Sequence, residues 1–194
     1  MSSDIRIAII VGSTRPNRRG GLVGEWVRQG AEELGHTVEV VDLAAWDLPL
    51  LDEPNPAIHG DYANPHTRDW AATVAGFDAF VFVVPEYNHS FPAALKNAID
   101  FLFAEWNDKA AGLVGYGVQA GVRGIEALRP VLSEVKVAHV RTQVCLNLMT
   151  DFVLTGPTDV GRIEPAPYQR EALAQLLDEV VAWAGALKGL RVPA

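Results

Sequence analysis

Five short apolar runs recur along the chain, separated by stretches in which apolar residues follow a helical spacing. Residues 5–11 are apolar except for Arg6, and residues 77–84 contain almost no polar side chain. Continuous runs of this kind are typical of strands that are covered on both faces, as in a parallel sheet. The pattern predicts strands at residues 5–11, 37–43, 77–84, 110–116 and 138–146.

Apolar stripes with a spacing of three and four residues predict the helices between and after these strands. The helices occupy segments that contain residues 23–34, 66–75, 95–103, 121–135 and 168–187. Strands that alternate with helices indicate a three-layer α/β domain, and right-handed crossovers leave few topologies. We therefore predict a single domain over residues 1–194, built on a doubly wound, five-stranded parallel sheet with the strand order 2-1-3-4-5.

Two proline-rich stretches, residues 44–65 and 147–167, fit no element. Each exceeds the roughly 15 residues beyond which an unstructured loop is unusual, so we expect a wall of a binding site or a subunit contact in each. The apolar cluster of Phe101, Phe103 and Trp106 also favours a buried subunit contact. Together these features predict a homo-oligomer.

The composition excludes several classes of protein. A net charge of −8 opposes binding to nucleic-acid backbones, and no apolar run approaches the roughly 20 residues that span a membrane. One cysteine, Cys145, excludes an internal disulfide and a cysteine-ligated cluster, so any redox chemistry requires a bound cofactor. The first residues lack the pattern of a secretory signal, and we expect a cytoplasmic protein.

The loop after the first strand combines glycines, hydroxyls and arginines directly before a helix. Unpaired backbone N–H groups and the helix dipole favour an anion there, and arginine adds donors that match phosphate oxygens. We interpret the loop as a phosphate site, with a turn that carries solvated arginines as the alternative. Neither a Walker loop nor a G-x-G-x-x-G motif is present, which disfavours a nucleoside triphosphate or a Rossmann-bound dinucleotide. The loop consists of Gly12, Ser13, Thr14, Arg15, Pro16, Asn17, Arg18, Arg19, Gly20 and Gly21.

Two further loops follow strand ends that meet at the same edge of the predicted sheet. Residues 85–92 (PEYNHSFP) suit a wall for a flat heteroaromatic ring, with a turn and helix cap as the alternative. Residues 115–124 (GYGVQAGVRG) contain glycines that permit a ligand edge to approach the backbone. Gly121 stands at a helix start, where backbone N–H groups stabilise negative charge, and a glycine-rich turn without a ligand is the alternative.

Several other side chains are expected to have structural roles. The five histidines show no paired ligand spacing, so no metal site is predicted, although His89 lies in a site loop. Trp26 and Trp183 lie on helical stripes and are expected in the core, whereas Trp106 is expected at a subunit contact. Cys145 is expected to be a small buried hydrophobe.

Three segments together resemble the NADPH-dependent FMN reductase family: GSTRP at 12–16, PEYNHSFP with LKNAID at 85–100, and YG at 116–117 followed by Gly121. The resemblance spans residue 5 to about residue 144, and the middle segment is highly specific. It implies a flavodoxin-like fold, bound FMN, NADPH or NADH as co-substrate, and a homodimer or homotetramer. Members of the family reduce flavins, quinones, azo dyes or oxidised metal ions.

The resemblance also implies roles for individual residues at three parts of FMN. The phosphate would contact Ser13, Arg15, Arg18, Arg19 and Gly20. The ribityl chain and one side of the isoalloxazine would contact Pro85, Glu86, Tyr87 and Asn88. The other edge of the ring would contact Tyr116, Gly117 and Gly121.

The expected reaction is hydride transfer from the nicotinamide to FMN, followed by reduction of a small acceptor at the same flavin face in a ping-pong sequence. The cofactor carries this chemistry, so no side chain is assigned as a catalytic acid or base. Two alternatives remain open. One is a non-enzymatic electron carrier of the flavodoxin type, and the other is an interaction protein whose partner reads the redox state of a bound flavin.

Overall fold

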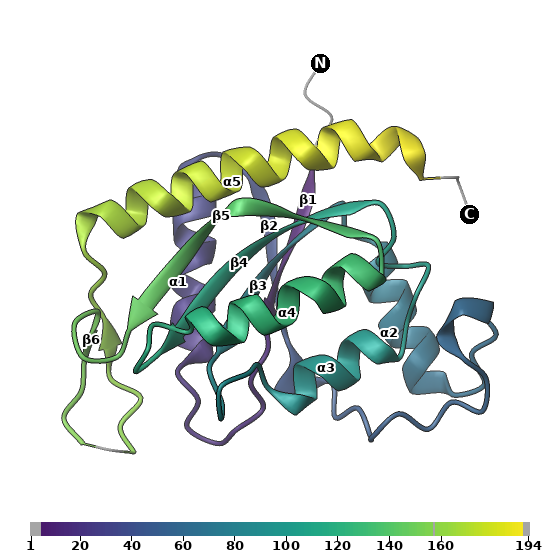
Figure 1. The fold of residues 1–194 in the computed structure, drawn as a ribbon, viewed down its shortest axis with the longest axis horizontal. Coiled ribbons are helices and arrows are strands. Elements are labelled where there is room, and N and C mark those ends of the chain that lie inside the picture. The colour runs from purple at the N-terminus through teal and green to yellow at the C-terminus, as the bar shows by residue number, and fades with distance from the viewer. Residues whose placement is uncertain (1–4, 157, 192–194) are drawn as a thin grey trace.

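A five-stranded sheet forms the centre of the computed structural model, which describes residues 5–156 and 158–191 (Figure 1). Neighbouring strands are parallel, and the order β2-β1-β3-β4-β5 confirms the predicted order. Every strand begins and ends within two residues of its predicted bounds. The strands are β1 (Arg6–Val11), β2 (Thr37–Asp42), β3 (Ala79–Pro85), β4 (Lys109–Gly117) and β5 (Val137–Asn147).

Helices cover both faces of the sheet, which confirms the three-layer arrangement (Figure 1). Ile7 and Ile9 of β1 pack toward the layer of α1 and α5, whereas Ala8 and Ile10 pack toward α2, α3 and α4. Because both faces are covered, β3 has no exposed residue. The helices are α1 (Gly20–Glu33), α2 (Pro65–Ala75), α3 (Ala93–Asp100), α4 (Val122–Glu134) and α5 (Pro167–Leu187), with short 3-10 helices at Leu43–Ala45, Ala57–His59 and Lys188–Leu190.

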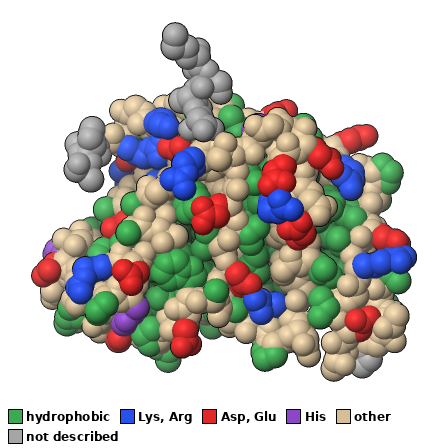
Figure 2. All heavy atoms as spheres, turned by 180° about the vertical axis from the view of Figure 1, so that it is seen from behind, with side chains coloured by type: hydrophobic (Ala, Val, Ile, Leu, Met, Phe, Trp, Pro, Cys, Tyr) green, Lys and Arg blue, Asp and Glu red, His purple; other side chains and the backbone are tan. Residues whose placement is uncertain are grey.

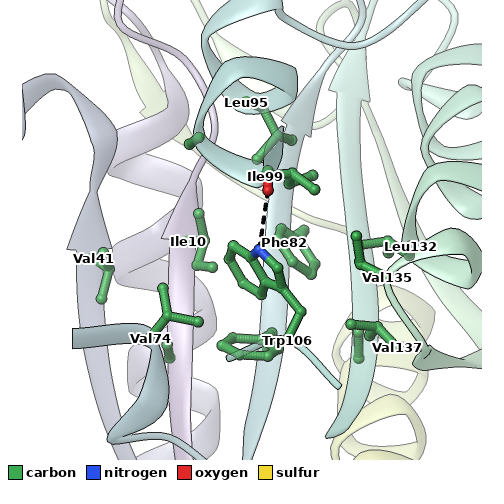
Figure 3. Packing of buried hydrophobic residues seen from close by; sticks show 14 of the residues in the cluster. Ile10, Val41, Val74, Phe82, Leu95, Ile99, Trp106, Leu132, Val135 and Val137 are labelled. Carbon is green, nitrogen blue, oxygen red and sulfur yellow. Dashed lines mark hydrogen bonds between the residues drawn. The ribbon is translucent and has the colours of Figure 1, made fainter. Parts of the chain in front are cut away.

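An aromatic cluster fills the core between the sheet and helices α2 and α3. Trp106 is 1% exposed, and its ring centroid lies 6.1, 5.0 and 6.2 Å from those of Trp70, Phe80 and Phe82. The indole N–H of Trp106 donates to the carbonyl oxygen of Ile99 at 3.2 Å, so its polar atom is satisfied inside the core (Figure 3). The expectation that Trp106 lines a subunit contact is therefore wrong.

Two other aromatic residues also differ from expectation. Phe101, expected with Trp106 at a subunit contact, is fully buried, because α3 ends one residue earlier and the chain turns inward. Trp183 is 46% exposed, because the adjacent Ala184 occupies the buried stripe of α5. Trp26 is buried on α1, as expected.

Side chains from two helices cover the edge strand β5. Glu179 of α5 accepts hydrogen bonds from the amide and hydroxyl of Thr142 at 3.1 and 2.6 Å. Arg129 of α4 donates to the carbonyl oxygen of Val140 at 3.1 Å. These contacts occupy strand groups that would otherwise be free to pair with another chain. Cys145, on the same strand, is partly exposed rather than fully buried as expected, and burial raises the pKa of its thiol.

The two proline-rich stretches are ordered by contacts with distant parts of the chain. In residues 44–65, the carbonyl oxygen of Pro49 accepts from the side-chain amide of Asn97 at 2.7 Å, and the amide of Leu51 donates to that side chain at 2.9 Å. The stretch 147–167 contains an antiparallel hairpin of β6 (Phe152–Val153) and β7 (Arg162–Ile163). The hairpin projects beside the first turns of α1 (Figure 1).

Basic and acidic side chains are interspersed on the face shown in Figure 2, rather than gathered into a field of one sign. Within residues 5–156 and 158–191, no helix is long and apolar enough to cross a membrane.

Lys109 at the start of β4 is a buried charge that links the sheet to α2. Its ammonium group donates to the carbonyl oxygens of Val74 and Ala75 at 2.8 and 3.4 Å, in the last turn of α2. Burial, with a smaller contribution from the charge of Arg191, lowers the pKa of Lys109 from 10.5 to about 8.

The lowered pKa of Lys109 predicts a specific dependence of stability on pH. The unfolded chain keeps the Lys109 proton up to about pH 10.5, whereas the folded protein loses it near pH 8, so the free energy of unfolding rises with pH in this interval. Between pH 8 and 9.5 we expect the free energy of unfolding of the wild type to rise by roughly 1.5 kcal/mol more than that of Lys109→Met. Urea unfolding at several pH values measures it. The exposed Lys136→Met is the matched control, and parallel curves for wild type and Lys109→Met would contradict the prediction.

Candidate active site

The loops after β1, β3 and β4 meet at the carboxyl edge of the sheet, as predicted, and enclose a cavity of about 60 Å³. This volume is well below the roughly 300 Å³ at which pockets for whole small molecules begin, so the cavity can hold only part of a ligand. Larger depressions of about 260 and 550 Å³ lie elsewhere and share no lining residue with it. The cavity is lined by Arg15, Arg19, Pro85, Glu86, Tyr87, Tyr116, Gly117 and Leu148.

A hydroxyl pair joins the first two loops. Ser13 is fully buried, and its Oγ lies 2.6 Å from the hydroxyl oxygen of Tyr87 in the loop after β3. The same Oγ accepts from the backbone amide of Arg15 at 3.4 Å. Ser13 therefore fixes the start of the first loop against the wall of the second.

The three arginines of the first loop lie in different environments. Arg18 forms an ion pair with Asp42 at the end of β2, and it does not line the cavity. Arg19 is buried, donates to the carbonyl oxygen of Asp159 at 2.6 Å, and has a buried Nε without a hydrogen-bond partner. Within the described part of the chain, no acidic side chain pairs with Arg15, which is exposed at the mouth of the cavity.

The amino end of α1 lies beside these arginines and has no capping side chain. The first backbone N–H groups of a helix have no partner within the helix, and they carry the positive end of its dipole. Gly20 is the first residue of α1 and is buried. The geometry therefore offers an anion site formed by backbone N–H groups and guanidinium donors.

An ion pair between a buried carboxylate and a partly exposed arginine fixes the second loop to α4. The side chain of Glu86 is 7% exposed, pairs with the guanidinium of Arg123 at 2.5 Å and accepts from its backbone amide at 3.1 Å. The next residues form a tight turn in which Asn88 and His89 have φ angles of 48° and 71°. Both are exposed, Asn88 does not line the cavity, and the His89 ring lies 3.0 Å from an Arg123 nitrogen.

The third loop brings a phenol and a glycine backbone to the cavity. Tyr116 is 5% exposed, and its hydroxyl has no hydrogen-bond partner in the described structure. Its carbonyl oxygen accepts from the amide of Glu86 at 3.0 Å, which joins the third loop to the second. Gly121 starts α4 with a φ of 76°, and a Cβ there would lie 2.3 Å from the amide nitrogen of Tyr116. Gly121 thus permits close backbone packing, but it does not line the cavity.

Most of the predicted site residues are brought together, and three are not. Arg18, Asn88 and Gly121 stay outside the cavity, whereas Ser13 and Gly20 lie directly beneath its lining. Sequence reasoning missed Leu148, which lies in a stretch assigned to no element, and did not select Arg123 from the glycine-rich loop that contains it. The predicted FMN-binding residues that line the cavity are Arg15, Arg19, Pro85, Glu86, Tyr87, Tyr116 and Gly117.

The side chains of residues 5–156 and 158–191 form no group of three or more His, Cys, Asp or Glu that could hold a metal ion.

Comparisons with known proteins agree with this geometry. The model of the NADPH-dependent FMN reductase family matches residues 5–151. An NAD(P)H-dependent FMN reductase of Schizosaccharomyces pombe is 38% identical over 157 residues, which cover 79% of this chain and 78% of the relative. The NAD(P)H-dependent FMN reductase LOT6 of Saccharomyces cerevisiae is 37% identical over 145 residues, which cover 69% of this chain and 76% of the relative.

Solved structures support the fold. The flavoenzyme NAD(P)H:(acceptor) oxidoreductase FerB from Paracoccus denitrificans superimposes with a TM-score of 0.71 at 21% identity, and the match covers 94% of this chain and 98% of FerB. A flavodoxin from the Archaea superimposes with a TM-score of 0.58 at 12% identity, covering 95% and 99% of the two chains. The fold is therefore flavodoxin-like, as the sequence predicts.

The motifs that carried the resemblance lie within a family match that covers all five strands of the central sheet, and the three loops they occupy meet in one site. The chain belongs to the NADPH-dependent FMN reductase family and is an oxidoreductase of the NAD(P)H-dependent FMN reductase and quinone reductase type.

Proposed function

We propose that this protein binds FMN at the candidate site and uses it to transfer electrons from NADPH or NADH to a small acceptor, such as a quinone, a flavin, an azo compound or a metal ion. The observation that carries the proposal is the uncapped start of α1 beside Arg15 and Arg19, below a wall formed by the loop after β3. When bound, FMN supplies the hydride acceptor and the electron donor that no side chain provides.

The residues present fit a flavin mononucleotide. Two buried polar atoms at the floor, Nε of Arg19 and the hydroxyl of Tyr116, have no partner in the described structure, and buried polar groups normally have one. An anion at the start of α1 would meet backbone N–H groups and guanidinium donors together. The cavity has room for a phosphate, and a ring system would lie over its mouth, between Tyr87 and Gly117.

The protein's own part in this reaction is to bind and orient the flavin and its substrates. Glu86 is paired with Arg123, and Ser13 bonds to Tyr87, so both side chains have structural partners that fix the loops of the site. His89 is exposed and lies against Arg123. We therefore assign no side chain as a catalytic acid or base.

We further propose that the nicotinamide and the acceptor occupy the same place in turn, which produces ping-pong kinetics. The described residues form one such three-loop site, with Leu148 and Tyr116 in its lining. Substrates must consequently approach from the open mouth, and the first product must leave before the acceptor enters.

Two alternatives predict different measurements. A flavodoxin-type carrier would bind FMN without oxidising NADPH directly. A redox-sensing interaction protein would oxidise NADPH too slowly to matter and would bind a partner only in one redox state. The guanidinium groups of Arg15 and Arg19 at the cavity favour the reductase, because both increase the density of positive charge available to a phosphorylated substrate.

A homodimer or homotetramer is also part of the proposal. Phe101 and Trp106 no longer support it, because both lie in the core of one chain. The stretch 44–65 supports it instead, because Leu50 and Ile58 are 85% and 64% exposed. Light scattering at micromolar concentration is expected to give a multiple of the mass of one chain, and the mass of one chain would exclude an oligomer.

The proposed function is tested first on the purified protein. We expect the visible spectrum of bound oxidised flavin, and we expect NADPH added under anaerobic conditions to bleach it within the time of mixing by hand. A yellow protein that NADPH does not bleach would indicate the carrier, and a colourless protein that cannot be loaded with FMN would contradict the proposal.

Arg15→Ala is expected to raise the dissociation constant of FMN about tenfold or more, because it removes a charge-assisted contact worth about 1.5 kcal/mol. Titration of apoprotein with FMN, followed by flavin fluorescence, measures the change. Arg170→Ala, which removes an exposed arginine on α5, is the matched control. An unchanged FMN dissociation constant for Arg15→Ala would contradict a contact between Arg15 and the phosphate.

Two variants of the loop after β3 separate orientation from acid–base chemistry. Tyr87→Ala removes the hydroxyl contact with Ser13 and is expected to slow flavin bleaching by NADPH ten- to a hundredfold, because about 1 Å of displacement costs that much in rate. His89→Ala is expected to leave the bleaching rate within about twofold, because hydride transfer needs no proton donor. Stopped-flow absorbance isolates this half-reaction, and a thousandfold loss in His89→Ala with FMN still bound would make His89 a catalytic residue.

A further inference from the structure

The hydroxyl of Tyr116 points toward the start of α1. A Cβ built on Gly20, the first residue of that helix, would lie 3.0 Å from this hydroxyl oxygen. Tyr116 belongs to β4, so the end of this strand reaches across the site to the helix that follows β1. The resemblance to the family implied a place for Tyr116 at the edge of the flavin ring, whereas its polar atom lies at the phosphate end.

This hydroxyl is buried but has no hydrogen-bond partner within residues 5–156 and 158–191. Burial, together with the neighbouring phenol of Tyr87, raises the pKa of Tyr116, so the group stays protonated at neutral pH and is available as a donor. The charge of Arg15, the hydroxyl of Ser13 and the charge of Arg18 lower this pKa by smaller amounts, although the Ser13 hydroxyl itself bonds to Tyr87 at 2.6 Å. A protonated, unpartnered donor among positive charges is suited to an anion.

The β6–β7 hairpin contacts both Tyr116 and Arg19 at this end of the site. Phe152 of β6 packs on the ring of Tyr116, with the ring centroids 6.4 Å apart. At the other end of the hairpin, the carbonyl oxygen of Asp159 accepts from Arg19 at 2.6 Å. The hairpin lies beyond the segment that matches the family model, which ends at residue 151.

The side chain of Asp159 gives the hairpin loop its shape. Its carboxylate accepts from the amide and hydroxyl of Thr155 at 3.0 and 2.6 Å, and from the amide of Gly161 at 3.0 Å. These bonds fix the direction of the Asp159 carbonyl, which in turn fixes the guanidinium of Arg19. The side chain itself does not line the cavity.

We propose that the hydroxyl of Tyr116 donates a hydrogen bond to the phosphate of FMN, and that the β6–β7 hairpin braces Tyr116 and Arg19 at the start of α1. Tyr116 is then a residue that selects the phosphorylated flavin over riboflavin. Asp159 is a positioning residue that slows the release of FMN without touching it. This inference rests on the proposed function, because it requires FMN as the ligand.

The first test compares FMN with riboflavin, which has the same ring and ribityl chain but no phosphate. Tyr116→Phe removes only the hydroxyl and keeps the ring against Phe152, and Tyr168→Phe removes an exposed hydroxyl as the matched control. Fluorescence titration of apoprotein is expected to show a rise of about tenfold in the FMN dissociation constant for Tyr116→Phe. The riboflavin constant is expected to stay within twofold, and Tyr168→Phe is expected to change neither.

The second test addresses the hairpin through the rate at which FMN leaves. Asp159→Ala is expected to increase the dissociation rate of FMN at least fivefold, measured by stopped-flow fluorescence when excess apoflavodoxin traps the released flavin. The riboflavin dissociation rate is expected to stay unchanged. Asp178→Ala, an exposed position on α5, is the matched control.

The outcomes distinguish a failure of this inference from a failure of the proposed function. An unchanged FMN constant in Tyr116→Phe, or an equal loss of FMN and riboflavin, would overturn the assignment of its hydroxyl to the phosphate. An unchanged FMN release rate in Asp159→Ala would overturn the brace. A wild-type protein that binds neither flavin would instead contradict the proposed function itself, and the inference would fail with it.

Discussion

The close approach of α1 to the end of β1 is the constraint on which the rest of the site depends. A Cβ at Gly20 or at Gly24 would lie 2.9 Å from a methyl carbon of Val11, and Val11 is fully buried on a strand with stiff β-branched neighbours. Larger side chains at either glycine would displace the helix from the sheet. Its uncapped N–H groups would then no longer lie beside Ser13 and the Tyr116 hydroxyl, and the donors would not converge on one anion.

The three loops hold one another at fixed positions through bonds between residues far apart in the chain. Ser13 contacts Tyr87 by their hydroxyls, and the amide of Glu86 bonds to the carbonyl oxygen of Tyr116. The buried carboxylate of Glu86 is held by Arg123, which compensates for the cost of burying its charge. Each loop therefore has a contact with the next one that does not involve a ligand. A floor that is ordered before binding loses little conformational entropy when the cofactor arrives.

The sheet and the meeting of the three loops could be predicted because they follow from local patterns. Continuous apolar runs identify buried parallel strands, and the order of a doubly wound sheet brings the ends of β1, β3 and β4 together. The bond between Arg19 and the carbonyl of Asp159 could not be predicted, because it joins residues 140 positions apart and uses a backbone atom that every residue has. Whether a side chain points into the core or toward solvent could not be predicted either. Trp26 and Trp183 both lie on apolar helical stripes in the sequence, yet the first is buried and the second is exposed.

The two ends of the site differ in how much the structure restricts them, and this difference bears on what the proposed enzyme accepts. At the proposed phosphate end, Arg19 and Tyr116 are buried and contact the β6–β7 hairpin, so a ligand there must match fixed donors. At the mouth, Asn88 and His89 are exposed on a tight turn that two backbone hydrogen bonds between Tyr87 and Ser90 close, at 2.8 and 3.0 Å. A closed phosphate end selects one cofactor, whereas an open mouth places few steric limits on the molecules that approach it. Under the proposed function, specificity for the cofactor and breadth toward acceptors are thus properties of different elements, the hairpin with α1 on one side and the turn after β3 on the other.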